Sequence, residues 1–191
     1  MQIKRFILGP LANNCFCIIP SNSSEIAVID APQGSEEVVA WAAENNYSIK
    51  YVILTHNHYD HTDGLSAFPP EIPVIHHKDE LEGEGGTKVA NATKIAGGEE
   101  FQVGDITLKT IHTPGHTLGG ICIYANGHLF SGDTLFCRNI GRADLPGGNL
   151  GVLISSIKEK LLILPEDTKV YPGHGPESTI SVEKEKNPYL N

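Results

Sequence analysis

Hydrophobic and polar positions in the first third of the chain form short runs typical of β-strands. They predict strands over residues 2–8, 15–19 and 25–30, with a Pro-Ser-Asn-Ser turn at 20–23 between the last two. Val38, Val39 and Ala42 recur at helical spacing and predict a helix from Gly34-Ser35 to Asn46. The continuous apolar run within residues 50–55 predicts a buried strand, and residues 73–76 predict another.

The second half of the chain repeats this order of strands followed by helices. Strands are predicted over residues 101–103, 106–111, 121–125, 128–130 and 170–171, and Asn126-Gly127 indicates a tight hairpin. Helices are predicted over residues 150–164 and 177–186. Residues 83–98 are rich in Gly, Lys, Thr and Asn without periodicity, which predicts a mobile loop, and their Gly85-Gly86-Thr87-Lys88 lacks the residue order of a phosphate-binding loop. The whole pattern predicts an α+β fold of two mixed sheets covered by helices on the outside.

Length and charge narrow the class of protein. The 191 residues are enough for one domain, over residues 1–191, and carry a formal net charge of −9, which argues against a surface that follows nucleic-acid phosphates. No apolar run approaches the ~20 residues that span a membrane, and the first ten residues do not resemble a signal peptide. The four cysteines are too few and too scattered for a disulfide scaffold. We therefore expect a reduced, cytoplasmic protein without membrane or nucleic-acid partners; the sequence leaves its oligomeric state open.

Histidines cluster directly after the buried strand at residues 50–55. His56, His58, Asp60 and His61 place four good metal ligands within six positions. Buried imidazoles and carboxylates need partners, so four of them cannot simply pack in a core. A solvated polar turn is the alternative interpretation, and it is weakened because strand ends are where α/β folds place their sites.

Three further strands end in a glycine-containing turn that carries a single residue of ligand type. These residues are His116 after residues 106–111, Asp133 after residues 128–130 and His174 after residues 170–171. One such turn alone is a weak signal. Four strand ends that together deliver five His and two Asp predict a metal site.

The order His56-x-His58-x-Asp60-His61, followed by His116, Asp133 and His174, resembles that of the metallo-β-lactamase superfamily over essentially the whole chain. Residues 112–117, 131–136, 141–148 and 171–176 are similar to the glyoxalase II (hydroxyacylglutathione hydrolase) branch, especially its short bacterial members. The resemblance implies an αββα four-layer sandwich with the metal site at one edge.

The resemblance also implies a set of metal ligands. His56, His58 and His116 would hold one metal, Asp60, His61 and His174 would hold the second, and Asp133 would bridge them. Nitrogen and oxygen ligands without cysteine fit two zinc ions, and also iron or manganese.

A site of this kind implies hydrolysis. Two metals share a water, lower its pKa to roughly 7 and so supply a hydroxide that attacks a carbonyl carbon. Asp60 would orient this hydroxide. A thiolate leaves without a proton donor, whereas an amine needs one, which favours small thioesters such as S-lactoylglutathione.

Binding of the thiol portion depends on other residues. The chain ends shortly after His174, so we expect a short form that lacks the helical C-terminal domain with which longer glyoxalase II enzymes bind glutathione. Arg142 would hold a substrate carboxylate, or else pair with Asp144 on the surface.

The main alternative is a persulfide dioxygenase with a single iron held by two His and one Asp. A nuclease is disfavoured by the net charge, and a non-catalytic metal-binding module is disfavoured because all seven ligand positions are filled. The remaining histidines are assigned outside the metal site: His76, His77 and His128 on the surface, and His112 in a supporting role.

Overall fold

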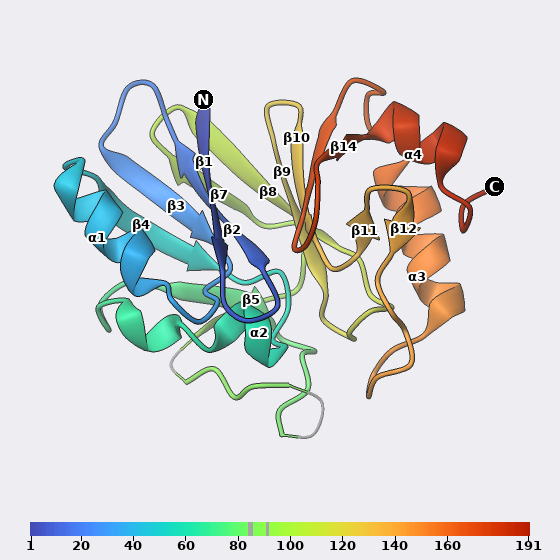
Figure 1. The fold of residues 1–191 in the computed structure, drawn as a ribbon, viewed down its shortest axis with the longest axis horizontal. Coiled ribbons are helices and arrows are strands. Elements are labelled where there is room, and N and C mark those ends of the chain that lie inside the picture. Colours follow the sequence, from blue (N-terminus) through green and yellow to red (C-terminus); the bar gives the residue numbers. More distant parts are fainter. Residues whose placement is uncertain (84–85, 91) are drawn as a thin grey trace.

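The computed structural model describes residues 1–83, 86–90 and 92–191. Two six-stranded sheets pack face to face, and helices cover the outer face of each (Figure 1). This arrangement confirms the four-layer αββα sandwich in a single domain. Within the described ranges, no helix is long and apolar enough to cross a membrane.

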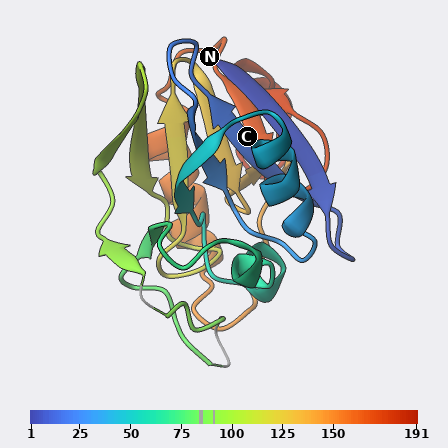
Figure 2. The same cartoon turned by 90° about the vertical axis from the view of Figure 1, so that its left-hand side faces the viewer.

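The first sheet is built from the N-terminal half of the chain. Its strands lie in sequence order: β1 (Gln2–Leu8), β2 (Asn13–Ile19), β3 (Glu25–Ile29), β4 (Ser48–Ile53), β5 (Val74–His77) and β6 (Thr93–Ile95). The first three strands pair antiparallel, and β3 to β6 pair parallel. On its outer side lie α1 (Glu36–Glu44), α2 (Tyr59–Thr62) and the 3₁₀ helix η1 (Leu65–Ala67) (Figures 1 and 2).

The second sheet comes from the C-terminal half. Its order is β14 (Ser178–Thr179), β13 (Lys169–Pro172), β10 (His128–Gly132), β9 (Ile121–Ala125), β8 (Ile106–His112) and β7 (Glu100–Val103). Strands β10 and β13 pair parallel, and the other neighbours pair antiparallel. Outside this sheet lie α3 (Leu150–Ser156), which continues into the π-helical segment η2 (Ile157–Leu161), and α4 (Ile180–Lys186). A small hairpin, β11 (Leu135–Phe136) and β12 (Asn139–Ile140), follows β10.

Three apolar layers hold these elements together. The central layer between the sheets contains Phe16, whose ring makes edge contacts with Phe130 at 5.3 Å and Tyr171 at 5.5 Å between centroids. A second layer joins the first sheet to α1 through Val38 and Ala42. The third joins the second sheet to α3, η2 and α4. Burial on both faces explains why β3 and β4 show continuous apolar runs in place of alternation.

Several predicted boundaries were wrong for identifiable reasons. The C-terminal helix begins at residue 180, not 177, because the Thr179 hydroxyl accepts from the backbone N–H of Val182 and residues 178–179 pair as β14. The stretch 83–98, predicted to be a mobile loop without structure, contains β6, whose parallel pairing with β5 no local pattern indicates. Residues 84, 85 and 91 of that stretch lie outside the described residues.

The topology brings five strand ends to one edge of the sandwich. In the first sheet β3 and β4 run parallel, and in the second β8, β10 and β13 point the same way, since β9 is antiparallel to both of its neighbours. The residues that follow these strands therefore meet where the two sheets adjoin. Asn14, at the start of β2, links the sheets there: its backbone N–H donates to the Gly173 carbonyl at 2.7 Å.

Candidate metal centre

All seven predicted ligands lie together at this edge. His56 and His58 follow β4, Asp60 and His61 lie on α2, and His116, Asp133 and His174 follow β8, β10 and β13. Helix α2 is a single turn that directs Asp60 towards His174 and places His61 between the two sets of side chains, with its ring centroid 4.0 Å from that of His56 and 5.4 Å from that of His174. The local bend therefore divides one short motif between two groups of ligands.

The first group consists of His56, His58 and His116. One nitrogen from each of these rings lies within 4.8 Å of the others. His58 contributes its Nδ1, which is 3.0 Å from Nε2 of His116. Three imidazoles around one point form a donor set suited to a borderline metal ion such as zinc.

The second group consists of Asp60, His61 and His174, whose donor atoms also lie within 4.8 Å of one another. His174 Nε2 is 3.1 Å from Asp60 Oδ2, and His61 Nε2 is 3.6 Å from the same oxygen.

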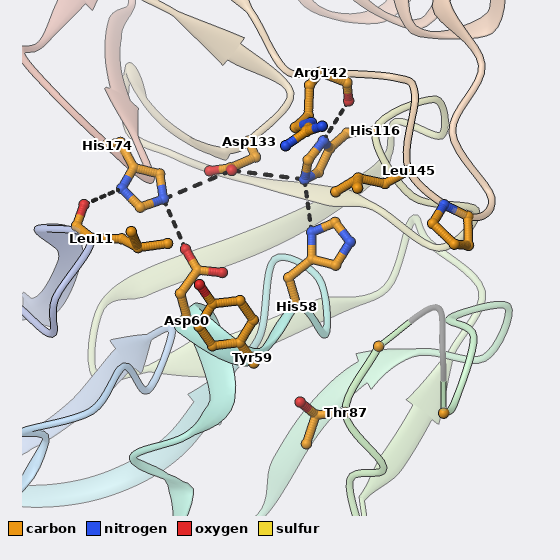
Figure 3. Close-up of a pocket in the computed structure, with 13 residues that line it drawn as sticks. Leu11, His58, Tyr59, Asp60, Thr87, His116, Asp133, Arg142, Leu145 and His174 are labelled. Carbon is orange, nitrogen blue, oxygen red and sulfur yellow. Dashed lines mark hydrogen bonds and ion pairs between the residues drawn. The ribbon is translucent and has the colours of Figure 1, made fainter.

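Asp133 lies between the two groups (Figure 3). Its Oδ1 is 3.3 Å from Nε2 of His61 in the second group, and its Oδ2 is 3.7 Å from Nε2 of His116 in the first. Among the seven side chains, this carboxylate has one oxygen near a donor of each group. Its position is the one the resemblance implies for a bridging ligand.

Four of the five imidazoles use their second nitrogen for a hydrogen bond to the surrounding protein. The pairs are His56 Nδ1 with the Thr55 hydroxyl at 3.0 Å, His61 Nδ1 with Asp30 at 2.8 Å, His116 Nδ1 with the Arg142 carbonyl at 2.7 Å, and His174 Nδ1 with the Leu11 carbonyl at 3.0 Å. An N–H donated outwards fixes the tautomer and turns the bare Nε2 lone pair inwards, as histidine ligands of metals require.

The hydrogen bonding of the donor atoms that face the middle of the centre shows whether the site suits a metal ion. His56 Nε2, His61 Nε2 and Asp133 Oδ1 are buried, and within the described part of the chain none of them makes a well-formed hydrogen bond, although the last two lie 3.3 Å apart. A buried polar atom without a partner is costly, and native structures keep few of them. Three such atoms that face one another are satisfied together by cations. The residues present therefore fit a metal centre.

The pKa shifts of the histidines at the centre also favour bound cations. Burial lowers the pKa of His56 and lowers the pKa of His58 to about 4, with further lowering by neighbouring imidazoles, so both rings are neutral at pH 7. Burial also acts to lower the pKa of His61 and His174, but nearby carboxylates, Asp30 at His61 and Asp60 at His174, raise it above the ordinary value instead. The second group thus favours positive charge, which a divalent cation supplies.

Asp30 is the residue that the sequence analysis missed. It is 1% exposed, follows β3 and adopts a positive φ of 61°. One of its oxygens accepts from the backbone N–H of Thr55 at 2.7 Å and the other from His61; the Thr55 hydroxyl, 2.9 Å away, donates to it and accepts from His56. This one carboxylate therefore orients a ligand of each group. Its position directly after a buried apolar strand was the available signal, the same one that identified Asp133.

Glycine is required where the backbone passes close to the centre. A Cβ on Gly173 would lie 2.4 Å from Asp133 Oδ1 and 2.7 Å from His61 Cε1. No side chain fits there without displacing a predicted ligand. The glycine turns noted in the sequence thus allow close approach as well as bending.

A cavity of about 500 Å³ opens over the two groups. His58, Asp60, His116, Asp133 and His174 form its base. Around them lie Leu11, Tyr59, Gly83, Gly86, Thr87, Arg142, Leu145 and Pro146 (Figure 3). Leu11 and Tyr59 are about half exposed at its rim. The cavity is large enough for a small molecule and is mostly apolar away from the predicted ligands.

Arg142 lines this cavity but is paired. Its Nε and Nη2 donate to the two carboxylate oxygens of Asp144, each at 2.8 Å, and both side chains are exposed. Of the two roles considered for Arg142, the structure contains the ion pair. A substrate carboxylate would compete with Asp144 for the guanidinium.

The remaining histidines lie outside the centre. His76 and His77 are each 1% exposed, so their assignment to the surface was wrong; His77 donates to the Ala96 carbonyl at 2.7 Å. His112 stacks on His77 at 3.9 Å between centroids and donates to the Leu118 carbonyl at 2.9 Å. It thereby supports the turn that carries His116. His128 is half-buried against Tyr171, not exposed as expected.

Comparisons with known proteins agree with this architecture. The model of the metallo-β-lactamase superfamily matches residues 8–174. A probable metallo-hydrolase of Bacillus subtilis, YqgX, is 34% identical over 100% of this chain and 98% of its own, and the hydroxyacylglutathione hydrolase GloC of Haemophilus influenzae is 31% identical over 100% and 99%. The crystal structure of the B3 metallo-β-lactamase BLEG-1 superposes with a TM-score of 0.88 at 32% identity, covering 99% of both chains. TTHA1623, solved in a di-iron-bound form, gives 0.81 at 28% identity, covering 98% of this chain and 100% of its own.

Proposed function

Because the chain belongs to the metallo-β-lactamase superfamily, we propose that it is a two-metal hydrolase of small thioesters, with residues 1–191 as its hydrolase domain. The observation that carries the proposal is the convergence of seven donor residues, five of which line one cavity, with three buried donor atoms that make no well-formed hydrogen bond in the described structure. A structural polar cluster would satisfy all three atoms with well-formed hydrogen bonds.

Each predicted ligand has a role in this proposal. His56, His58 and His116 would hold one metal, and Asp60, His61 and His174 the other, with Asp133 shared. Zinc is the proposed metal, with iron or manganese as alternatives; the di-iron form of TTHA1623 keeps iron in consideration. When bound, two such metals activate a water at neutral pH and polarise the substrate carbonyl.

Asp60 has a second role beyond holding a metal. Its carboxylate lines the cavity, with Oδ2 3.1 Å from His174 Nε2. It can therefore accept a hydrogen bond from the attacking water and orient it towards a carbonyl carbon in the cavity. Holding the reacting atoms in this orientation is what the protein itself contributes.

The cavity favours a leaving group that departs without a proton. Both of its carboxylates in the described structure, Asp60 and Asp133, belong to the predicted ligands, which leaves neither to act as proton donor. A thiolate, whose conjugate acid has a pKa of ~8.5, departs unprotonated, whereas an amine needs a donor.

The cavity also bears on the choice of thioester. Its one cationic side chain outside the ligand set, within the described residues, is Arg142, which Asp144 neutralises. Recognition of an anionic thiol portion is correspondingly weak. The likeness to GloC supports cleavage of S-lactoylglutathione, and the paired arginine supports little preference for it over other small thioesters.

Two other activities serve as competing outcomes. A persulfide dioxygenase would use a single iron and consume oxygen, so its metal content and oxygen uptake separate it from a hydrolase. β-Lactam hydrolysis is the second competing activity, because the chain resembles the B3 metallo-β-lactamase BLEG-1. The four free cysteines support a reducing compartment, and a cytoplasmic location is part of the proposal.

The test combines metal content with a substrate panel. Purified protein is analysed for bound metals and assayed with S-lactoylglutathione, several smaller thioesters, a chromogenic cephalosporin and a glutathione persulfide with an oxygen electrode. We expect two metals per chain and turnover of several thioesters. The proposal is contradicted if the protein binds one iron per chain and consumes oxygen. It is also contradicted if cephalosporin turnover exceeds thioester turnover.

A further inference from the structure

One wall of the cavity comes from a segment that contributes none of the predicted ligands. Gly83, Gly86 and Thr87 line the cavity, and Thr87 lies across it from Arg142 (Figure 3). Gly83 and Gly86 pair through a backbone bridge, in which Gly86 N–H donates to the Gly83 carbonyl at 3.2 Å. The position of this wall relative to His58 therefore determines the width of the cavity on that side.

Asn57 fastens this wall to the centre. Its side chain is 0% exposed, and its Nδ2 donates to the carbonyls of Leu81 and Thr87, the latter at 3.0 Å. Its own backbone carbonyl accepts from Thr87 N–H at 2.8 Å. Because Asn57 lies between His56 and His58, these three hydrogen bonds tie the wall directly to the ligand segment.

Gly86 packs tightly against the same side chain. A Cβ on Gly86 would lie 2.2 Å from Oδ1 of Asn57, 2.6 Å from its Cγ and 2.8 Å from its Nδ2. The three nearest atoms all belong to Asn57, so this side chain is the first obstacle to anything larger than glycine. The wall is thus held by hydrogen bonds and by close packing at one point.

Glu80 supports Asn57 from the other side. Its Oε1 accepts from the hydroxyl of Thr117 at 2.7 Å, and the carboxyl lies close enough to the backbone N–H of Asn57 for that group to lower its pKa. Thr117 follows His116, so Glu80 joins the turns that carry all three ligands of the first group. Asn57 is consequently fixed to a rigid base and not to a free loop.

We propose that Asn57 is a positioning residue that holds the wall formed by Gly83, Gly86 and Thr87 over the first ligand group and thereby sets which acyl groups the cavity accepts. The inference rests on the proposed hydrolysis for its kinetic part only. The side chain of Asn57 turns towards the wall and makes no contact with the reacting atoms, so its effect is on binding and not on the chemical step.

The first test is Asn57→Ala in the metal-loaded protein. Loss of two buried hydrogen bonds raises KM by about ten-fold or more, with kcat and the bound metal nearly unchanged. The backbone N–H of Thr87 exchanges faster with deuterium, because the side-chain hydrogen bond that holds Thr87 against the Asn57 carbonyl is lost. The matched control is Asn45→Ala, since Asn45 also donates to a carbonyl, that of Trp41, but on the exposed end of α1.

The second test is a double-mutant cycle with Gly86→Ala. Alone, this substitution forces the wall away from Asn57 and raises KM as well. In the combined Asn57→Ala/Gly86→Ala variant the three clashing atoms are absent, so the added methyl group causes little further change. Strong non-additivity is the signature of a direct contact.

The outcomes separate this inference from the proposed function. If the wild type cleaves no thioester, the proposed function fails, while exchange at Thr87 in the same four proteins still tests the wall. An unchanged KM and unchanged Thr87 exchange in Asn57→Ala overturn the inference. Loss of bound metal with an equal loss of kcat also overturns it, because Asn57 would then support the ligands and not the wall.

Discussion

Replacement of Glu80 by glutamine tests the energetics of the support beneath the centre. Glu80 is 8% exposed, and burial raises the pKa of its carboxyl from 4.5 to about 7, against the lowering effect of its hydrogen bonds with Thr117 and Asn57. Its second oxygen, Oε2, is buried without a partner in the described structure. The folded protein therefore holds this carboxyl in its protonated form up to neutral pH.

The sign and size of the effect follow from this shift. Between pH 4.5 and 7 the folded state binds more protons at Glu80 than the unfolded state, so the free energy of unfolding falls as pH rises through this window. A gap of about 2.5 pKa units corresponds to at most roughly 3 to 4 kcal/mol, since each unit is worth ~1.4 kcal/mol. A glutamine side chain at this position cannot ionise and resembles the protonated acid. The Glu80→Gln variant should lie within about 1 kcal/mol of the wild type near pH 5 and exceed its free energy of unfolding by about 3 kcal/mol at pH 8.

Urea unfolding of both proteins at intervals from pH 5 to pH 8 measures this difference. Because both proteins carry the same predicted ligands, pH effects from metal binding cancel in the comparison. Glu99→Gln is a control without a pH trend in this range, since hydrogen bonds from the Ala96 and Gly97 amides lower the pKa of this exposed carboxyl below 4.5, and its contribution changes only at lower pH. A difference between wild type and Glu80→Gln that stays constant across the range, or that favours the wild type at high pH, refutes the reasoning.

Four further substitutions test the centre. Asp133→Ala should reduce both bound metal and turnover while circular dichroism stays native, and unchanged metal content would contradict its shared position. Asp30→Asn should weaken metal affinity ~10–100-fold by altering the partners of two ligands, and equal affinity in a metal titration would show that this carboxylate is dispensable. Arg142→Ala should raise KM only a few-fold, because its ion pair is already formed; a large fall in kcat would place it in the chemistry. His112→Ala should cost less metal and activity than His116→Ala, and the reverse order would mean that the two histidines have exchanged roles.

The sequence predicted the positions that chemistry constrains most tightly. Three of the predicted ligands, His116, Asp133 and His174, each follow a strand and a glycine-containing turn. This pattern is local in the sequence, so it can be recognised without knowing how the strands pack. Strand direction then determines which ends meet, so the convergence at one edge follows from the same pattern. The continuous apolar character of β3 and β4 likewise reflects burial on both faces.

Features that depend on distant parts of the chain could not be predicted in the same way. His76 and His77 look like a polar strand end next to Lys78, yet both are buried, and His77 stacks on His112 from the other sheet. Strand β6 has no alternating pattern and exists because β5 offers a free edge. In each case the deciding partner lies far along the chain.

The groups that hydrogen-bond to the ligand histidines could not all be predicted from the amino-acid sequence, because two of them are backbone carbonyls. His116 and His174 donate to backbone carbonyls, those of Arg142 and Leu11, and a carbonyl is present whatever side chain the residue carries. The side chains of the same two residues line the cavity. The path of the backbone therefore orients the ligands, while the side chains at these positions are free to shape the cavity. A substitution at Leu11 or Arg142 changes what the cavity contacts and leaves the hydrogen bond to the ligand in place, which separates substrate recognition from the geometry of the centre.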